Sequence, residues 1–216
     1  MSGFSVVFDM DGVIFDTETV GLRAWVAVGE RHSLENVEHY ARECIGRSTK
    51  DTMAILRAAY KDVDIEHLRA ECTYEFKRII AAEGLTLKKG VKELLEWLKE
   101  NGIKTAIASS TEINGVKGHL RMAGIEEYFE KIIGGDMVTH SKPEPEIYLK
   151  ACEQLGEKPE NTYAIEDSNN GIISAFRAGM HPLLVPDIVE NTPEVRQMAE
   201  REFKDLLEVR DFLAQR

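Results

Sequence analysis

From residue 91 onward, the sequence alternates between amphipathic stretches of helical period and short apolar runs, and this alternation narrows the possible folds. The apolar runs are typical of strands buried on both faces, and they cover residues 103–108, 131–133, 162–165 and 182–185. The helical patterns cover residues 91–101, 114–123, 145–155, 171–178 and 204–215. Strands that alternate with helices predict a parallel sheet with right-handed crossovers. We therefore expect an α/β fold in which helices cover both faces of a parallel sheet.

The first 90 residues are organised differently. A short apolar run at residues 5–8 predicts one more strand of the sheet, and only helical patterns follow it, at residues 17–31, 35–44, 50–60 and 65–82. This helical block closes at Glu83 and Gly84. The sequence thus predicts a Rossmann-like core made of residues 1–16 and 85–216, which an all-helical insertion at residues 17–84 interrupts after the first strand.

Composition and charge exclude several classes of partner. The 216 residues carry a formal net charge of -11 at pH 7, whereas nucleic acids and anionic membranes select clustered lysine and arginine. Cys44, Cys72 and Cys152 are scattered, odd in number and without zinc spacing, which is typical of reduced thiols in a cytoplasmic protein. No leader pattern precedes the first strand, and no apolar run has the length to span a bilayer. We expect a cytoplasmic monomer that acts on a small molecule.

Two carboxylates, Asp9 and Asp11, directly follow the first predicted strand. The carboxyl end of a strand is where open α/β sheets bind their ligands. Residues two apart on an extended chain point to the same side, so the two side chains converge. Because two close anions repel each other unless a cation or a shared proton lies between them, the pair predicts a metal ion and acid–base chemistry.

The other predicted strands also end in polar residues, each of a distinct kind. Ser109, Ser110 and Thr111 follow residues 103–108, Lys142 precedes a helix that opens with proline, and Glu166 and Asp167 follow residues 162–165. Side by side at one sheet edge, these ends supply carboxylates, a hydroxyl and an ammonium. Hard oxygen ligands suit Mg²⁺ better than zinc. A metal with one lysine and one hydroxyl is what phosphoryl transfer needs, because that reaction depends on positioning and charge neutralisation.

The two leading carboxylates then take different chemical roles. Asp9, when ionised, can attack phosphorus and form an acyl phosphate, and Mg²⁺ offsets its repulsion from the incoming phosphate. Asp11 can protonate the leaving oxygen and afterwards deprotonate the water that hydrolyses the intermediate.

Taken in order, these motifs resemble the four motifs of the haloacid dehalogenase superfamily. They are Asp9-Met10-Asp11-Gly12-Val13, Ser109, Ser141-Lys142-Pro143-Glu144-Pro145, and Ile165-Glu166-Asp167-Ser168 followed by Gly171. The match is nearest to the phosphatase and β-phosphoglucomutase-like branch, which inserts a helical cap after the first motif.

The resemblance implies a role for each matching residue. Asp9 is expected as nucleophile, Asp11 as general acid/base, and Ser109 and Lys142 as the residues that hold the transferring phosphate, with Ser110 as a further phosphate contact. Mg²⁺ is expected at Asp9, at the backbone carbonyl of Asp11 and at Asp167. Glu166 is expected either as a further metal ligand or as a residue that contacts the ligands without binding the metal itself. The helical cap is expected to close over the site and to select the substrate.

Mutases and phosphatases of this branch differ in the cap. Members that resemble β-phosphoglucomutase carry His, Lys and Arg at positions that here are Gly21, Ile45 and Thr49. Arg47 is offset from the last of these positions. Without cations to hold a second phosphate, water is expected to take the intermediate, so we favour a phosphatase of a small phosphorylated metabolite, in particular a sugar or polyol phosphate.

Two alternatives stay open at this point. One is an isomerase that resembles β-phosphoglucomutase. The other is a phospho-accepting signalling receiver, which also gathers acids, a hydroxyl and a lysine around Mg²⁺. A receiver is a shorter domain, however, and it has its phospho-acceptor on an interior strand and no helical insertion.

Overall fold

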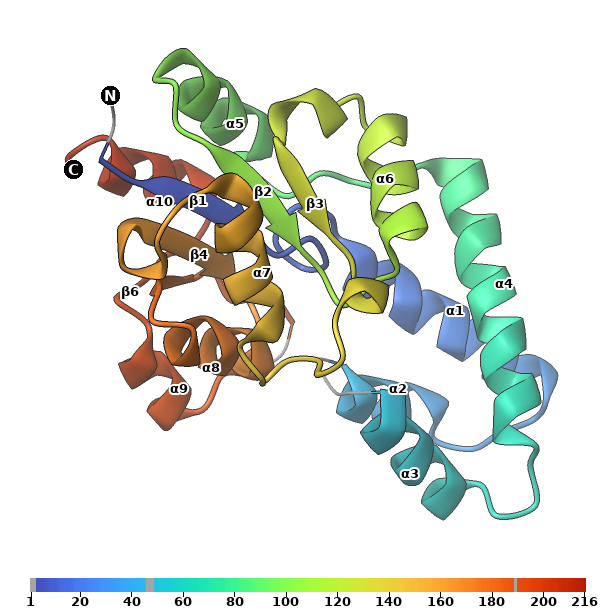
Figure 1. Ribbon diagram of the computed structural model, residues 1–216. Helices are drawn as coiled ribbons and strands as arrows, with labels where there is room; N and C mark the ends of the chain where they lie inside the picture. Colours follow the sequence, from blue (N-terminus) through green and yellow to red (C-terminus); the bar gives the residue numbers. More distant parts are fainter. Residues whose placement is uncertain (1–2, 46–48, 189) are drawn as a thin grey trace. The chain divides into compact units, whose positions relative to one another are not determined.

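The chain divides into two compact units, which are described separately. The computed structural model describes residues 3–45, 49–188 and 190–216, with the backbone alone at residues 49 and 50 (Figure 1). One unit consists of Met1–Phe15 and Leu87–Arg216, and the other is Asp16–Thr86. The sequence-based boundaries, after residues 16 and 84, lie one and two residues from these.

The larger unit is built on a six-stranded sheet in which every neighbouring pair of strands is parallel. The strand order is β3-β2-β1-β4-β5-β6. The strands are β1 (Ser5–Phe8), β2 (Thr105–Ala108), β3 (Lys131–Ile133), β4 (Thr162–Glu166), β5 (His181–Leu184) and β6 (Arg201–Glu202). Phe8, the last residue of β1, pairs with Ile107 of β2 and Ile165 of β4. The carboxyl ends of these three strands therefore meet at one edge, and the predicted α/β class with a Rossmann-like parallel sheet is confirmed.

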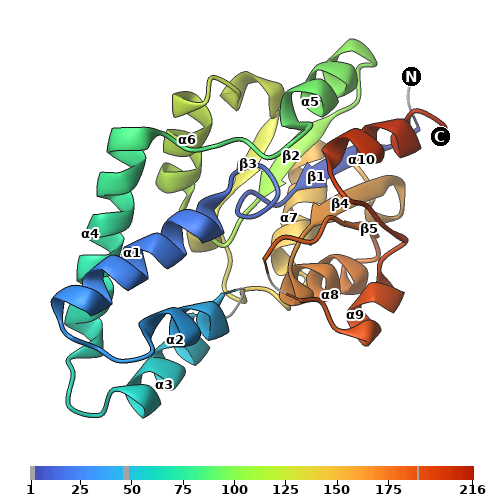
Figure 2. The same ribbon diagram turned by 180° about the vertical axis from the view of Figure 1, so that it is seen from behind.

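Helices cover both faces of this sheet, as predicted. The longer ones are α5 (Val91–Glu100), α6 (Ile113–Met122), α7 (Glu146–Leu155), α8 (Asn169–Arg177), α9 (Pro193–Met198) and α10 (Leu206–Leu213). Short 3-10 turns occur at Glu126–Tyr128, Gly135–Met137 and Pro159–Asn161. In Figure 1, α7 and α8 lie in front of the sheet, and α5 and α10 come to the front when the molecule is turned in Figure 2. Apolar residues of α7 and α8 share one buried cluster with Val7, Ala106 and Ala164 of the central strands.

The smaller unit contains only helices among its described residues. They are α1 (Thr17–Arg31), α2 (Val37–Cys44), α3 (Thr49–Ala59) and α4 (Ile65–Glu83). Helices α1 and α4 pack along each other through Val20, Ala24, Ile79 and Ile80. No helix in the described part of the chain combines the length and the apolar character needed to cross a membrane. Of the predicted cap positions, Gly21 lies on α1 and Ile45 follows α2. Arg47 and the side chain of Thr49 lie outside the described residues.

The helical insertion leaves the core and returns to it at a single place. Phe15 forms an antiparallel bridge with Leu87. The Lys88 N–H donates to the carbonyl of Ile14 at 2.9 Å, and one step further along the insertion the Asp16 N–H donates to the carbonyl of Thr86 at 3.0 Å. The entering and returning segments thus form a short hydrogen-bonded stem.

Helix α9 and strand β6 were not predicted, and two predicted helices, α2 and α10, each start two residues late. Helix α9 begins at Pro193 behind Thr192, whose hydroxyl accepts from the Val195 N–H, and this cap is a signal that the sequence offers. Strand β6 has two exposed residues and therefore no apolar pattern. Helix α2 starts at Val37 and not at residue 35, because Asn36 has a left-handed φ of 56° that a helix interior does not accept.

Candidate active site

Asp9 is held at the end of β1, in the middle of the sheet edge. Its backbone N–H donates to the carbonyl of Ile165 on β4 at 3.0 Å, which extends the strand pairing by one residue. The residue is 7% exposed. Burial raises the pKa of Asp9 well above its usual value, Lys142 opposes this shift, and the nearby Glu166 and Asp11 carboxylates add to it. This site therefore favours cations beside Asp9.

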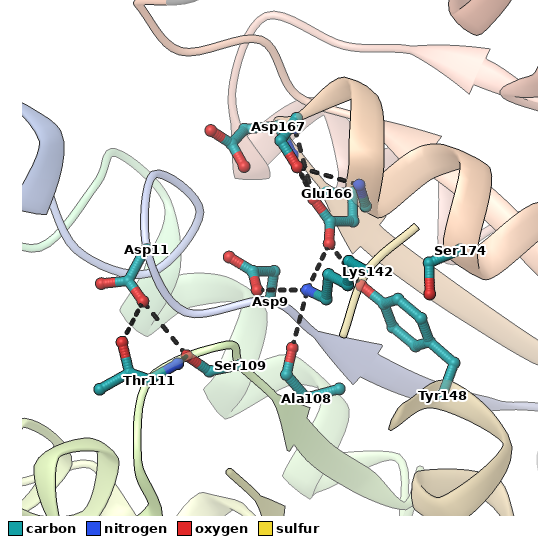
Figure 3. A network of polar contacts seen from close by, with 12 residues as sticks. Asp9, Asp11, Ala108, Ser109, Thr111, Lys142, Tyr148, Glu166, Asp167 and Ser174 are labelled. Atoms are coloured by element: carbon teal, nitrogen blue, oxygen red, sulfur yellow. Dashed lines mark hydrogen bonds and ion pairs between the residues drawn. The ribbon is translucent and has the colours of Figure 1, made fainter. Parts of the chain in front are cut away.

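Lys142 provides one such cation. Its Nζ lies 2.6 Å from Asp9 Oδ1, 2.6 Å from Glu166 Oε1 and 3.0 Å from the carbonyl oxygen of Ala108 (Figure 3). Burial alone would lower the pKa of this lysine, but the two carboxylates outweigh burial and raise the pKa. The side chain thus stays an ammonium with all three of its protons directed at oxygen atoms.

Glu166, the last residue of β4, is completely buried. Its Oε1 accepts from Lys142 and, at 2.7 Å, from the Tyr148 hydroxyl. Its Oε2 accepts from the Asp167 N–H at 3.2 Å, the Ser168 N–H at 3.3 Å and the Ser168 hydroxyl at 3.1 Å. A Cβ at Gly171 would lie 1.9 Å from this carboxyl group, so only glycine leaves space for it.

Asp9, Glu166 and Asp167 form a buried cluster in which one carboxylate oxygen of each residue lies within 4.8 Å of the others. Such a set of carboxylate oxygens suits a hard cation such as Mg²⁺. Gly12 approaches the cluster closely, because a Cβ there would lie 2.3 Å from Asp167 Oδ2. Its φ of 81° is also in the region that favours glycine.

Asp11 and Ser109 form a second group beside the first (Figure 3). Oδ2 of Asp11 accepts from the Ser109 hydroxyl at 3.2 Å and from the Thr111 hydroxyl at 3.0 Å. The Thr111 N–H in turn donates to Ser109 Oγ at 3.0 Å. Both hydroxyls therefore fix the orientation of the Asp11 carboxyl group.

The structure brings together all but one of the side chains that the sequence analysis selected. Asp9, Lys142, Glu166 and Asp167 share one cluster, and Asp11 and Ser109 are adjacent to it. Ser110, in contrast, is exposed, and it is the hydroxyl of its neighbour Thr111 that contacts Asp11.

Sequence reasoning missed two members of the network. Tyr148 lies on the buried side of α7, where its aromatic ring resembles any core residue. Ser168 contacts Glu166 and also caps α8 by accepting from the Gly171 N–H. A serine at that place is a recognisable cap signal, but its contact with the carboxylate is not.

The chain is similar to known proteins over most of its length. The family model described as haloacid dehalogenase-like hydrolase matches residues 6–185. The chain belongs to this family. A phosphorylated carbohydrates phosphatase from Thermotoga maritima is 36% identical over 177 residues, which cover 82% of each chain. Hexitol phosphatase A from Escherichia coli is 29% identical and covers 89% of this chain and 87% of its own.

The crystal structure of a putative β-phosphoglucomutase from Thermotoga maritima shows the same fold. Its TM-score is 0.82 at 31% identity, and the match covers 98% of this chain and 99% of that chain. The predicted superfamily, its β-phosphoglucomutase-like branch and the enzyme class of a phosphatase-type hydrolase are confirmed.

Proposed function

We propose that the chain is a Mg²⁺-dependent phosphatase that hydrolyses a small phosphorylated sugar or polyol through an aspartyl phosphate on Asp9. The observation that carries the proposal is the buried Lys142 ammonium, 2.6 Å from Asp9 and 2.6 Å from Glu166, beside a cluster of carboxylates. Relatives named as phosphatases of phosphorylated carbohydrates and of hexitols support the substrate class.

In the first step, a carboxylate oxygen of Asp9 forms a bond to phosphorus while the bond from phosphorus to the substrate oxygen breaks. The attacking group must be ionised, and the ammonium of Lys142 favours that form. Asp9 and Asp167 offer side-chain oxygens to Mg²⁺, which when bound neutralises charge on the transferring phosphate. Asp11 gives its proton to the leaving oxygen, so the product alcohol departs neutral.

In the second step, water attacks the aspartyl phosphate. Asp11 takes a proton from this water, the bond between Asp9 and phosphorus breaks, and inorganic phosphate leaves. The hydroxyls of Ser109 and Thr111 hold one Asp11 oxygen, which keeps the carboxyl group oriented for both proton transfers. We also assign Ser109 to the phosphate: its hydroxyl would then donate to a phosphate oxygen in place of Asp11, and Thr111 would continue to hold Asp11.

We assign the choice of substrate to the helical unit. The residues that handle the phosphate all belong to the larger unit, and they contact only the group that every phosphate ester shares. Within the helical unit, a cavity of about 280 Å³ is lined by aromatic, hydroxyl and cationic side chains, among them Trp25, Thr52, Arg69, Thr73 and Phe76. Such a lining suits a polyhydroxylated carbon chain.

The test is a phosphate-release screen over sugar and polyol phosphates, with Mg²⁺ present and with Mg²⁺ removed by a chelator. We expect inorganic phosphate from at least one carbohydrate ester, and no release after chelation. Hexose 1-phosphate incubations are analysed in parallel for the 6-phosphate, because accumulation of that isomer without phosphate release would replace the phosphatase by a mutase. Phosphate release that continues at full rate without any divalent metal would refute the proposed mechanism.

A further inference from the structure

Tyr148 is a buried residue that contacts both Lys142 and Glu166. Its side chain is 0% exposed, and it lies on α7, six residues after Lys142. The hydroxyl is 2.7 Å from Glu166 Oε1, the same oxygen that accepts from Lys142. The Lys142 Nζ also lies 5.0 Å from the centre of the Tyr148 ring, and Figure 3 shows the phenol reaching toward this pair.

Counting the acceptor positions of Glu166 shows what the hydroxyl does. A carboxylate offers about four lone-pair positions, two on each oxygen. On Oε1 both are taken, by the ammonium of Lys142 and by the hydroxyl of Tyr148. On Oε2 three donors converge from Asp167 and Ser168. A metal ion could bind this carboxylate only by displacing a donor.

The Tyr148 hydroxyl is a permanent donor. An ionised carboxylate can only accept a hydrogen bond, so the hydroxyl is the donor in its 2.7 Å contact with Glu166 Oε1. A buried hydroxyl without a partner is costly, and Glu166 Oε1 is the partner that Tyr148 has in this structure. A metal ion that took the place of the Tyr148 hydroxyl on Glu166 Oε1 would leave this buried donor unpaired.

We propose that Tyr148 is a positioning residue whose hydroxyl reserves Glu166 for Lys142, so that Glu166 anchors the lysine and is not a metal ligand. Asp9 and Asp167 then supply the side-chain oxygens for the metal. This inference rests on the proposed function, and it narrows the ligand set that the sequence suggested by removing Glu166.

The decisive variant is Tyr148→Phe, which removes the hydroxyl and keeps the ring. We expect kcat to fall about tenfold or more, as is usual when the partner that orients a site residue is lost. We also expect the Kd of Mg²⁺, measured by calorimetry without substrate, to stay within about twofold of the parent value. Ser5→Ala is the matched control, because it removes a buried hydroxyl bond of 2.8 Å to Thr162 at the opposite end of β1 and β4.

Two results would overturn the proposal. If Tyr148→Phe weakens Mg²⁺ binding about tenfold, Glu166 belongs to the metal. If kcat, KM and Mg²⁺ affinity all match those of Ser5→Ala, Tyr148 only fills the core. These results can be told apart from a failure of the proposed function. The affinities for Mg²⁺ and for inorganic phosphate are measured without turnover, so they do not depend on whether the chain hydrolyses a substrate. A phosphate Kd that rises in Tyr148→Phe at unchanged Mg²⁺ Kd supports the proposal even for a chain that hydrolyses nothing in the screen.

A second pair of variants keeps the proposal testable if Tyr148→Phe does not fold. Glu166→Gln and Asp167→Asn each remove one carboxylate charge at neighbouring positions of the same strand end. With Glu166 as the lysine anchor, Asp167→Asn should weaken Mg²⁺ binding at least about tenfold more than Glu166→Gln. An equal loss of Mg²⁺ affinity in the two variants would contradict the assignment of Glu166 as the lysine anchor.

Discussion

Lys142 Nζ lies 2.6 Å from Asp9 Oδ1, although 133 positions separate the two residues in the sequence. The parallel sheet makes this contact possible, because β1 lies between β2 and β4 and the ends of all three strands meet at one edge. A local sequence pattern fixes each partner at a strand end or in a loop, and the sheet order then brings the partners together.

Asp9→Asn should reduce phosphate release by about 1,000-fold or more, because the amide cannot form the acyl phosphate. The fold should persist, since burial already disfavours the charge of this carboxylate. Phosphate release and thermal unfolding measured on one preparation test both statements. Turnover near the parent rate in a well-folded variant would show that Asp9 is not the nucleophile.

Lys142→Met should both inactivate and destabilise the protein. Two buried carboxylates, Asp9 and Glu166, would lose their shared cation, and breaking a buried ion pair from one side costs about 3–5 kcal/mol in unfolding free energy. Lys99→Met is the matched control, because Lys99 also contacts a carboxylate, 3.4 Å away on Glu127, and a tyrosine ring, but is 60% exposed. Urea unfolding should show a large loss for the first variant and little change for the second. A similarly small change in unfolding free energy for both variants would contradict the buried ion pairs of Lys142.

Gly171→Ala should destabilise the core, although glycine in a helix is normally unfavourable. The new Cβ would lie 1.9 Å from the Glu166 carboxyl carbon, and forced overpacking costs about 1–3 kcal/mol. Gly118→Ala, in α6, meets nothing within 4 Å and should stabilise the fold by about 0.5–1 kcal/mol. Urea midpoints that shift in the same direction for the two variants would count against the described position of Glu166.

Thr111→Val should lower kcat about tenfold, with little change in KM. The valine keeps the shape of the side chain but removes one of the two hydroxyls that hold Asp11 Oδ2. Thr111→Ser retains the hydroxyl and should restore most of the rate. Steady-state kinetics of the three proteins decide the matter, and a serine variant as slow as the valine one would assign the loss to packing.

Cys72 should resist alkylation in the native protein over a wide pH range. Burial raises the pKa of this thiol to about 12, and the thiolate is the reactive form. The labelling rate should therefore rise about tenfold per pH unit from pH 7 to 10, without the plateau near pH 9 expected of an ordinary thiol. Mass spectrometry after iodoacetamide treatment, with a urea-unfolded sample as reference, measures this. A plateau near pH 9 in folded protein would show that the Cys72 thiol has an ordinary pKa, which contradicts its burial.

Much of the site follows from the sequence because most of its polar residues lie at, or just after, the end of a strand. Asp9, Ser109 and Glu166 sit where buried apolar runs stop, so strand prediction places them at the sheet edge. Lys142 follows no predicted strand directly, and it was found through its position before the proline-opened helix.

The missed contacts have a different physical origin. Tyr148 belongs to the apolar side of an ordinary amphipathic helix, and only the packing of α7 against the sheet reveals that its hydroxyl reaches a charge. The choice between Ser110 and Thr111 depends on which way the loop turns after β2. That direction cannot be predicted from three successive hydroxyl residues, Ser109, Ser110 and Thr111.

The hydrogen-bonded stem at Phe15 and Leu87 has an evolutionary consequence. Because the helical insertion leaves and re-enters the core at one point, its length and sequence can change without altering the register of any strand. Every described member of the catalytic network lies outside the insertion. With the proposed role of the helical unit in substrate choice, exchange of this insertion would change the substrate while the residues at the sheet edge stay the same.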